Sequence, residues 1–253
     1  MVGDLYSSDR TEEKPVILIL HGASVFGRKL PLIQALSQEF QELGYPVFAF
    51  DARGFGESEK PAEYTPESFD FSQDVRSAID VLSDREGFAN RRFYIVGHSF
   101  GGGVALGASD RDSRIEKVVI FGPPRRLGER FLNPEAREKI KLLVRWQGDM
   151  QLDRPLEFDL WSQVLAPLNI ENYVERFSQP GHTPLFIVDA EDEPDPDLAF
   201  LREFYQHTVD PTDYWTVPAT NHYLDSGFRL NVPQYYPPTI RSFVEKVDRW
   251  FAA

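Results

Sequence analysis

The sequence contains no cysteine in its 253 residues. This absence excludes a disulfide framework, a thiolate metal site and a cysteine nucleophile. Long apolar runs are also missing, since no stretch approaches the roughly 20 apolar residues that a helix needs to cross a bilayer. The first residues lack a basic segment followed by an apolar one. We therefore expect a soluble protein, cytoplasmic by default, and secreted or periplasmic if a signal segment was removed before residue 1.

Positive charge is scarce, because 27 lysines and arginines stand against 40 acidic residues, for a net charge of −13. Such a field opposes binding to nucleic acid or to an anionic membrane, and we expect neither as a partner. A chain of this length, 42% hydrophobic, suffices for one large domain with a buried core. The composition leaves the oligomeric state open.

Apolar segments alternate with amphipathic ones along most of the chain. The apolar runs predict strands, and apolar residues at helical spacing predict helices. Strands are expected at 15–20, 47–50, 92–96, 117–121, 184–188 and 213–217. Helices are expected at 30–43, at 68–82, directly after Ser99, at 197–207 and at 238–251. The alternation predicts an α/β fold with right-handed βαβ units and a mostly parallel, doubly wound sheet.

The alternation stops between residues 122 and 183. Helical segments are expected there near 134–146, 156–165 and 170–177, and no strand pattern is present. We therefore predict an α/β core of residues 1–122 and 183–253, interrupted by a helical cap or lid at 123–182. The aromatic residues of this insertion suit an apolar substrate pocket or the cap's own core.

The run GHSFG at residues 97–101 matches the pattern G-x-S-x-G. It follows a predicted strand and precedes a helix rich in small residues. A serine on so sharp a turn has strained backbone torsions, and the flanking glycines avoid collisions where the strand and the helix approach closely. Ser99 is therefore the candidate nucleophile.

Four motifs resemble those of the α/β-hydrolase superfamily, and the resemblance extends from Pro15 to Trp250. They are HGA at 21–23, DARGFGES at 51–58, GHSFG at 97–101 and Asn221-His222. The resemblance implies the α/β-hydrolase fold of a serine esterase or lipase, with a catalytic triad, a nucleophile elbow, an oxyanion hole and no cofactor. The run at 51–58 resembles a structural loop of the superfamily, so no catalytic role is assigned to its Asp51 and Arg53.

The serine needs a general base, and histidine has the best-matched pKa among side chains. His98 is next to the nucleophile but is expected to point elsewhere, and His21 belongs to the oxyanion loop. His182 ends the cap and His207 belongs to a predicted helix. His222 remains, and it follows the last strand, where the superfamily places its base.

The superfamily places the triad acid in the loop after the strand 184–188, where it fixes the histidine tautomer. That loop is crowded with carboxylates, namely Asp189, Glu191, Asp192, Glu193 and Asp195. If Ala190 takes the glycine position of the family pattern G-x-x-D, the acid is Glu193. Asp192 is the second candidate, and Asp195 serves if the loop is shifted. Acidic surface runs are usually solvated, and we expect no metal here.

The resemblance assigns the oxyanion hole to the backbone N–H groups of Ala23 and Phe100. We predict a serine hydrolase that cleaves a small-molecule carboxylic ester through an acyl-enzyme. Thioester hydrolysis, amide or peptide hydrolysis, cofactor-free perhydrolysis and hydroxynitrile cleavage use the same triad and stay open. Dehalogenases and epoxide hydrolases need a carboxylate nucleophile, so Ser99 argues against both. A non-catalytic ligand-binding protein of the same fold is the alternative from another class.

Overall fold

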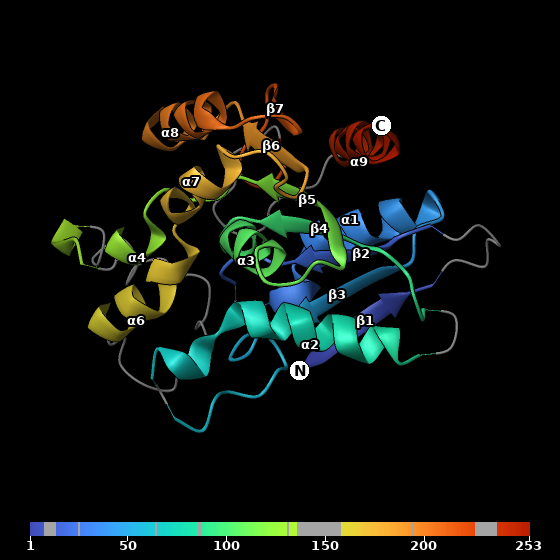
Figure 1. Cartoon of the computed structure of the whole chain (residues 1–253), viewed down its shortest axis with the longest axis horizontal. Helices are drawn as coiled ribbons and strands as arrows, with labels where there is room; N and C mark the ends of the chain where they lie inside the picture. Colours follow the sequence, from blue (N-terminus) through green and yellow to red (C-terminus); the bar gives the residue numbers. More distant parts are fainter. Residues whose placement is uncertain are drawn as a thin grey trace.

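A computed structural model describes residues 1–7, 14–24, 26–63, 65–85, 88–130, 132–135, 158–193, 195–225 and 237–253. A seven-stranded sheet in the order β1-β3-β2-β4-β5-β6-β7 forms its centre (Figure 1). Every strand pair is parallel except β1 with β3. The strands are β1 (Val2–Tyr6), β2 (Val16–Leu20), β3 (Val47–Asp51), β4 (Phe93–His98), β5 (Ile115–Phe121), β6 (Leu185–Ala190) and β7 (Thr212–Val217). The predicted mostly parallel α/β sheet is confirmed.

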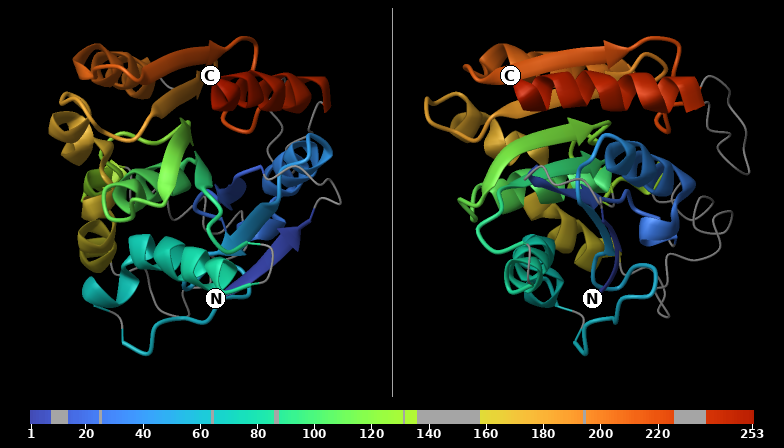
Figure 2. Two further views of the ribbon diagram at one scale, coloured as in Figure 1. Left: turned by 45° about the vertical axis from the view of Figure 1, so that its right-hand side comes forward. Right: turned by 90° about the vertical axis from the view of Figure 1, so that its right-hand side faces the viewer.

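Helices cover both faces of the sheet (Figure 2). One face packs against α1 (Pro31–Glu42) and α9 (Pro237–Ala252). The other packs against α2 (Phe71–Ser83), α3 (Phe100–Ser109) and α8 (Asp195–His207). Every residue of β2, β4 and β6 is buried as a result, which explains why these strands are continuous apolar runs in the sequence.

The edge strand β1 is absent from the sequence prediction, which places the first strand at residue 15. This strand pairs antiparallel with β3, and its residues are partly exposed. Its sequence, VGDLY, has too few apolar residues to give a strand signal. Gly3 is required by packing, because a Cβ there would lie 2.4 Å from the ring of Phe48. The pairing is therefore set by contacts with β3 rather than by local sequence.

Several predicted boundaries shift by two or three residues. The helix expected from Ser68 begins at Phe71, after the short 3₁₀ helix η2 (Glu67–Phe69). Asp70 caps α2, since its carboxylate accepts hydrogen bonds from the backbone N–H groups of Ser72 and Gln73. The helix expected at 197–207 begins at 195, and the strand expected at 117–121 begins at 115.

The described elements between β5 and β6 are all helical. They are α4 (Leu127–Arg130), α6 (Phe158–Leu165), η3 (Ala166–Leu168), η4 (Ile170–Tyr173) and α7 (Val174–Phe177). The helix predicted at 134–146 lies outside the described residues except for 134 and 135. The 3₁₀ helix η3 lies against α3, because a Cβ on Gly103 would be 2.3 Å from the Leu168 carbonyl oxygen. No described helix is long and apolar enough to cross a membrane.

Candidate active site

Ser99 stands on the turn between β4 and α3 with φ 54° and ψ −121°. This torsion lies in a region that non-glycine residues rarely adopt. Its backbone N–H donates to the Phe121 carbonyl 2.8 Å away, and its carbonyl accepts from the Gly102 N–H at the same distance. The strained turn is thus tied to β5 on one side and to α3 on the other. The residue is half-buried at the carboxyl edge of the sheet.

Two glycines allow this turn to form. A Cβ at Gly97 would lie 2.3 Å from the Gly101 carbonyl oxygen, and a Cβ at Gly101 would lie 2.5 Å from the Leu20 carbonyl oxygen. Both contacts involve backbone atoms, so no side chain can move aside to relieve them. The pattern G-x-S-x-G therefore has its expected steric basis in this chain.

Phe100 is the first residue of α3, so its N–H has no carbonyl partner within the helix. The helix dipole adds a partial positive charge at this end. The Phe100 side chain is buried in an aromatic cluster with Phe55 and Phe71, at ring-centroid distances of 5.4 and 4.9 Å. This packing fixes the peptide that carries the predicted oxyanion donor.

The second predicted donor, Ala23, belongs to a loop organised by His21. The His21 Nε2 accepts the Ala52 N–H at 3.1 Å, so Nδ1 carries the proton and donates to the Gly22 carbonyl at 2.7 Å. Burial lowers the pKa of His21 below its ordinary value, which favours the neutral ring. In a trans peptide the C=O and the next N–H point in opposite directions. Holding the Gly22 carbonyl therefore fixes the direction of the Ala23 N–H.

His222 and Glu193 form a hydrogen-bonded pair across two loops. His222 Nδ1–H donates to Glu193 Oε1. The His222 side chain is 28% exposed and that of Glu193 is 10% exposed. With Nδ1 committed to the carboxylate, Nε2 is the nitrogen left to accept a proton. Among the described residues, no hydrogen bond links Ser99 Oγ to His222.

Gly122 makes room for this pair, and sequence reasoning missed it. Its φ is +55°, and a Cβ there would lie 2.9 Å from both Glu193 Oε1 and His222 Nδ1. Its N–H donates to the Val188 carbonyl at 2.9 Å, which ties the end of β5 to β6. A glycine directly after a strand, beside the strand that precedes the acid loop, is the sequence signal that points to this role.

The other carboxylates near Glu193 have different partners. Asp189 is fully buried, accepts a hydrogen bond from the Tyr214 hydroxyl, and has its pKa raised by burial. Glu191 accepts the Ala219 N–H at 2.7 Å. Within the described ranges, no three acidic or histidine side chains converge as metal ligands. Glu193 is the carboxylate that the structure brings to His222.

The two remaining acid candidates lie on either side of Glu193. The side chain of Asp192 is exposed, and its backbone N–H donates to the Thr220 carbonyl at 3.0 Å. Asp195 is the first residue of α8. The Asp192 contact ties the acid loop to the His222 loop through the backbone. It positions Glu193 opposite His222 without using the Asp192 carboxylate.

The loop at 51–58 is built around a buried charge pair. Asp51 is fully buried and accepts the backbone N–H groups of Arg28 and Glu57 at 2.6 and 2.8 Å. The Arg28 guanidinium also binds this carboxylate, and its side chain is only 5% exposed. Arg53 pairs with Asp74 at 2.7 Å. These contacts hold the loop beside Ala52, whose N–H binds His21, and none reaches Ser99 directly.

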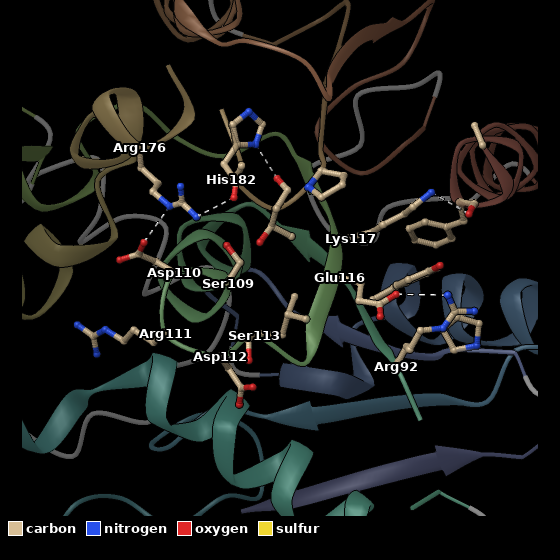
Figure 3. Close-up of a pocket in the computed structure, with 18 of the residues that line it drawn as sticks. Arg92, Ser109, Asp110, Arg111, Asp112, Ser113, Glu116, Lys117, Arg176 and His182 are labelled. Carbon is tan, nitrogen blue, oxygen red and sulfur yellow. Dashed lines mark hydrogen bonds and ion pairs between the residues drawn. The ribbon is translucent and has the colours of Figure 1, made fainter. Parts of the chain in front are cut away.

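A polar groove of about 1050 Å³ lies at the opposite edge of the sheet, around the amino ends of β4, β5 and β6 (Figure 3). Strand β4 separates it from Ser99 by roughly 17 Å, given the rise of a strand. Two ion pairs lie within it, Arg92 with Glu116 at 3.4 Å and Arg176 with Asp110 at 3.3 Å. The groove therefore does not belong to the Ser99 site.

Comparison with known proteins gives a family match over most of the chain. The family model described as serine aminopeptidase, S33, matches residues 11–173. An uncharacterised 31.7 kDa protein of Escherichia coli is 32% identical over 111 residues, 42% of this chain and 36% of that protein. The lysophosphatidylserine lipase ABHD12 of Bos taurus is 36% identical over 125 residues, 47% of this chain and 29% of that protein. The match thus spans about a third of the length of these relatives.

Solved structures agree with the whole architecture. The structure of Est1E from Butyrivibrio proteoclasticus with ferulic acid has a TM-score of 0.69 to this chain. The alignment covers 100% of this chain and 96% of the Est1E chain, at 18% sequence identity. At this identity the likeness is one of fold.

Proposed function

Since the chain belongs to the α/β-hydrolase superfamily, in the family described as serine aminopeptidase, S33, we propose that it is a serine hydrolase of small carboxylic esters. The family supports a hydrolytic activity. The observation that carries the assignment is the His222–Glu193 pair at the sheet edge where Ser99 stands on a strained strand-to-helix turn. A nucleophile, a base and an acid that orients the base are the parts that such a reaction needs.

The proposed reaction proceeds through an acyl-enzyme. Ser99 Oγ attacks the ester carbonyl while His222 Nε2 takes its proton, and Glu193 stabilises the imidazolium that forms. The N–H groups of Ala23 and Phe100 bind the oxyanion of the tetrahedral intermediate. His222 then gives the proton to the departing alcohol. Water enters by the same proton transfers in reverse order and releases the carboxylic acid. The hydrogen bond between a catalytic serine and its histidine base commonly forms only when substrate is bound.

The helices between β5 and β6 supply the proposed cap over this site. We propose the division made from the sequence, with the cap at 123–182 and the core on either side. The contact between Gly103 of α3 and Leu168 supports it, because the helical segment lies on the helix that begins at the nucleophile. The acyl and alcohol groups would be chosen by the surface that the cap presents.

Aminopeptidase activity is the second candidate, favoured by the description of the matched family. Ester hydrolysis comes first because ABHD12 is named a lipase, and Est1E was solved with ferulic acid. The discriminating experiment compares p-nitrophenyl esters of increasing acyl length with p-nitroanilides of single amino acids. We expect ester turnover that Ser99→Ala abolishes, and at least a hundredfold lower kcat/KM for the anilides. Preference for an anilide would instead support the aminopeptidase.

A further inference from the structure

His98, next to Ser99 in the sequence, makes a contact that the proposed triad leaves unexplained. It is the last residue of β4 and is 2% exposed. Its register partner is Phe121, and the two rings stack with centroids 5.4 Å apart. The His222 ring lies 4.7 Å from the His98 ring and 6.4 Å from the Phe121 ring, measured between centroids. The His98 ring therefore packs against both the end of β5 and the residue that carries the base.

One nitrogen of His98 binds the backbone of the base. The distance from His98 Nε2 to the His222 carbonyl oxygen is 2.9 Å. A carbonyl oxygen only accepts, so Nε2 carries the proton and donates it. His98 Nδ1 is buried and has no hydrogen-bond partner among the described residues. It faces Gly22, where a Cβ would lie 2.9 Å away.

The same geometry keeps His98 uncharged. Protonation of Nδ1 would place an unpaired cation in a buried site beside His222. Burial and the neighbouring His222 accordingly hold the pKa of His98 well below its ordinary value. A neutral donor holds the His222 backbone without opposing the positive charge that His222 acquires when it takes the serine proton.

Two hydrogen bonds join the His222 loop to the acid loop, from the Asp192 N–H to the Thr220 carbonyl at 3.0 Å and from the Ala219 N–H to the Glu191 carboxylate at 2.7 Å. The turn of the His222 loop is closed locally, because the Asn221 side chain accepts the Tyr223 N–H at 2.9 Å and the Asn221 carbonyl accepts the Leu224 N–H at 2.9 Å. These bonds shape the turn but do not fix it relative to Ser99. The His98 bond does, because His98 precedes Ser99 directly on β4.

On the premise of the proposed function, we infer that His98 is a positioning residue, which fixes the distance between the catalytic base and the nucleophile through its hydrogen bond to the His222 carbonyl. Small displacements of a catalytic group cost large factors in rate, whereas substrate binding depends on other surfaces. Loss of the bond should therefore lower kcat with little change in KM.

Three substitutions separate this role from packing. His98→Phe keeps a ring but has no N–H. His98→Gln places an amide nitrogen the same number of bonds from Cβ as Nε2, and His98→Asn places one at the Nδ1 position. With p-nitrophenyl acetate, we expect His98→Phe and His98→Asn to lower kcat roughly tenfold to a hundredfold, with KM within about twofold. We expect His98→Gln to stay within about threefold of wild type.

Phe243→Leu serves as the packing control, because the Phe243 ring on α9 packs against the Phe121 ring with centroids 5.5 Å apart. It should lower Tm without lowering kcat. Equal kcat in wild type and His98→Phe, or equal losses in the Gln and Asn variants, would overturn the role of His98 while leaving the proposed function intact. If His98→Phe fails to fold, the Gln and Asn pair alone decides. An inactive wild type would overturn both proposals.

Discussion

At the scale of single residues, the candidate site depends on a glycine without a side chain as well as on the side chains around it. Gly122 leaves the space in which Glu193 and His222 meet. His21 and His98 are buried, uncharged and bound to backbone atoms on either side of Ser99. These three residues do not take part in the proposed proton transfers. They place the groups that do.

Gly122→Ala should lower kcat/KM strongly while lowering the unfolding free energy only modestly. The added Cβ would lie 2.9 Å from Glu193 Oε1 and from His222 Nδ1, so the pair has to separate. We expect kcat/KM to fall about a hundredfold. The matched control is Gly54→Ala, which also has a positive φ, +80°, but whose Cβ would meet only Phe69 at 3.5 Å. Both variants should lose about 1–2 kcal/mol of stability, measured by urea unfolding. Equal activity in the two would refute the account of Gly122.

The identity of the acid can be tested within one loop. Glu193→Gln keeps the shape but removes the charge that stabilises the His222 imidazolium, so kcat/KM for p-nitrophenyl acetate should fall about a thousandfold or more. Asp192→Asn and Asp195→Asn should stay within about threefold of wild type, because the Asp192 side chain is exposed and His222 Nδ1 donates to the Glu193 carboxylate. A collapse in Asp192→Asn alone would move the acid to that position.

At the scale of elements, the central strands and most of the flanking helices were predictable from the sequence. Strands β2, β4 and β6 are buried at every residue and give apolar runs, and the helices give a clear period. Strand β1 was not predictable, since an edge strand is fixed by its neighbour. The predicted start of α2 was three residues too early, because the helix begins after its capping residue Asp70. The Asp70 cap is a local contact, whereas a boundary set by strand pairing depends on tertiary contacts.

The loop at 51–58 gives a prediction about buried and exposed ion pairs. Arg28→Ala leaves Asp51 buried without its cation, and unfolding free energy should fall by about 3 kcal/mol or more. Arg241→Ala removes a guanidinium that binds two carboxylates, Glu39 and Glu42, but is 58% exposed. That change should cost less than about 1 kcal/mol. Urea unfolding of the two variants measures the difference, and comparable losses would show that the Arg28 pair is not effectively buried.

At the scale of the whole molecule, the sequence indicated the sheet edge at which the site forms. Chain order and strand ends were enough to bring Ser99, the acid loop and His222 to one edge, since parallel strands share their carboxyl ends. Among the five carboxylates of the acid loop, the family pattern ranked Glu193 first but left Asp192 and Asp195 open. The choice depends on the Asp192–Thr220 backbone contact, which turns Glu193 toward His222. The support from His98 also depends on a contact 124 residues away in the chain.

Global stability should depend on pH through the buried histidines. Burial lowers the pKa values of His21 and His98, so below about pH 6.5 the unfolded chain binds protons that the folded chain does not. Unfolding free energy therefore falls with falling pH, by up to about 1.4 kcal/mol per pH unit for each histidine. Carboxylate titrations are shared by wild type and variants, so a comparison between proteins isolates the histidine contribution.

His98→Gln removes one of these groups. Between pH 7.5 and 5.5 it should lose about 1 kcal/mol less stability than wild type, measured by urea unfolding at both pH values. His207→Gln is the control, because His207 is exposed at the end of α8. A wild-type loss equal to that of His98→Gln would mean that His98 is protonated in the folded protein.

The central claim is that Ser99 is the nucleophile of a serine hydrolase, and covalent labelling tests it most directly. A fluorophosphonate reacts with a serine only when a base activates its hydroxyl. Intact mass and peptide mapping should show one adduct, on the peptide that contains Ser99, and none in Ser99→Ala. A wild-type protein that does not react would contradict the enzyme assignment. Labelling of Ser99→Ala at the wild-type rate would contradict the assignment of the nucleophile.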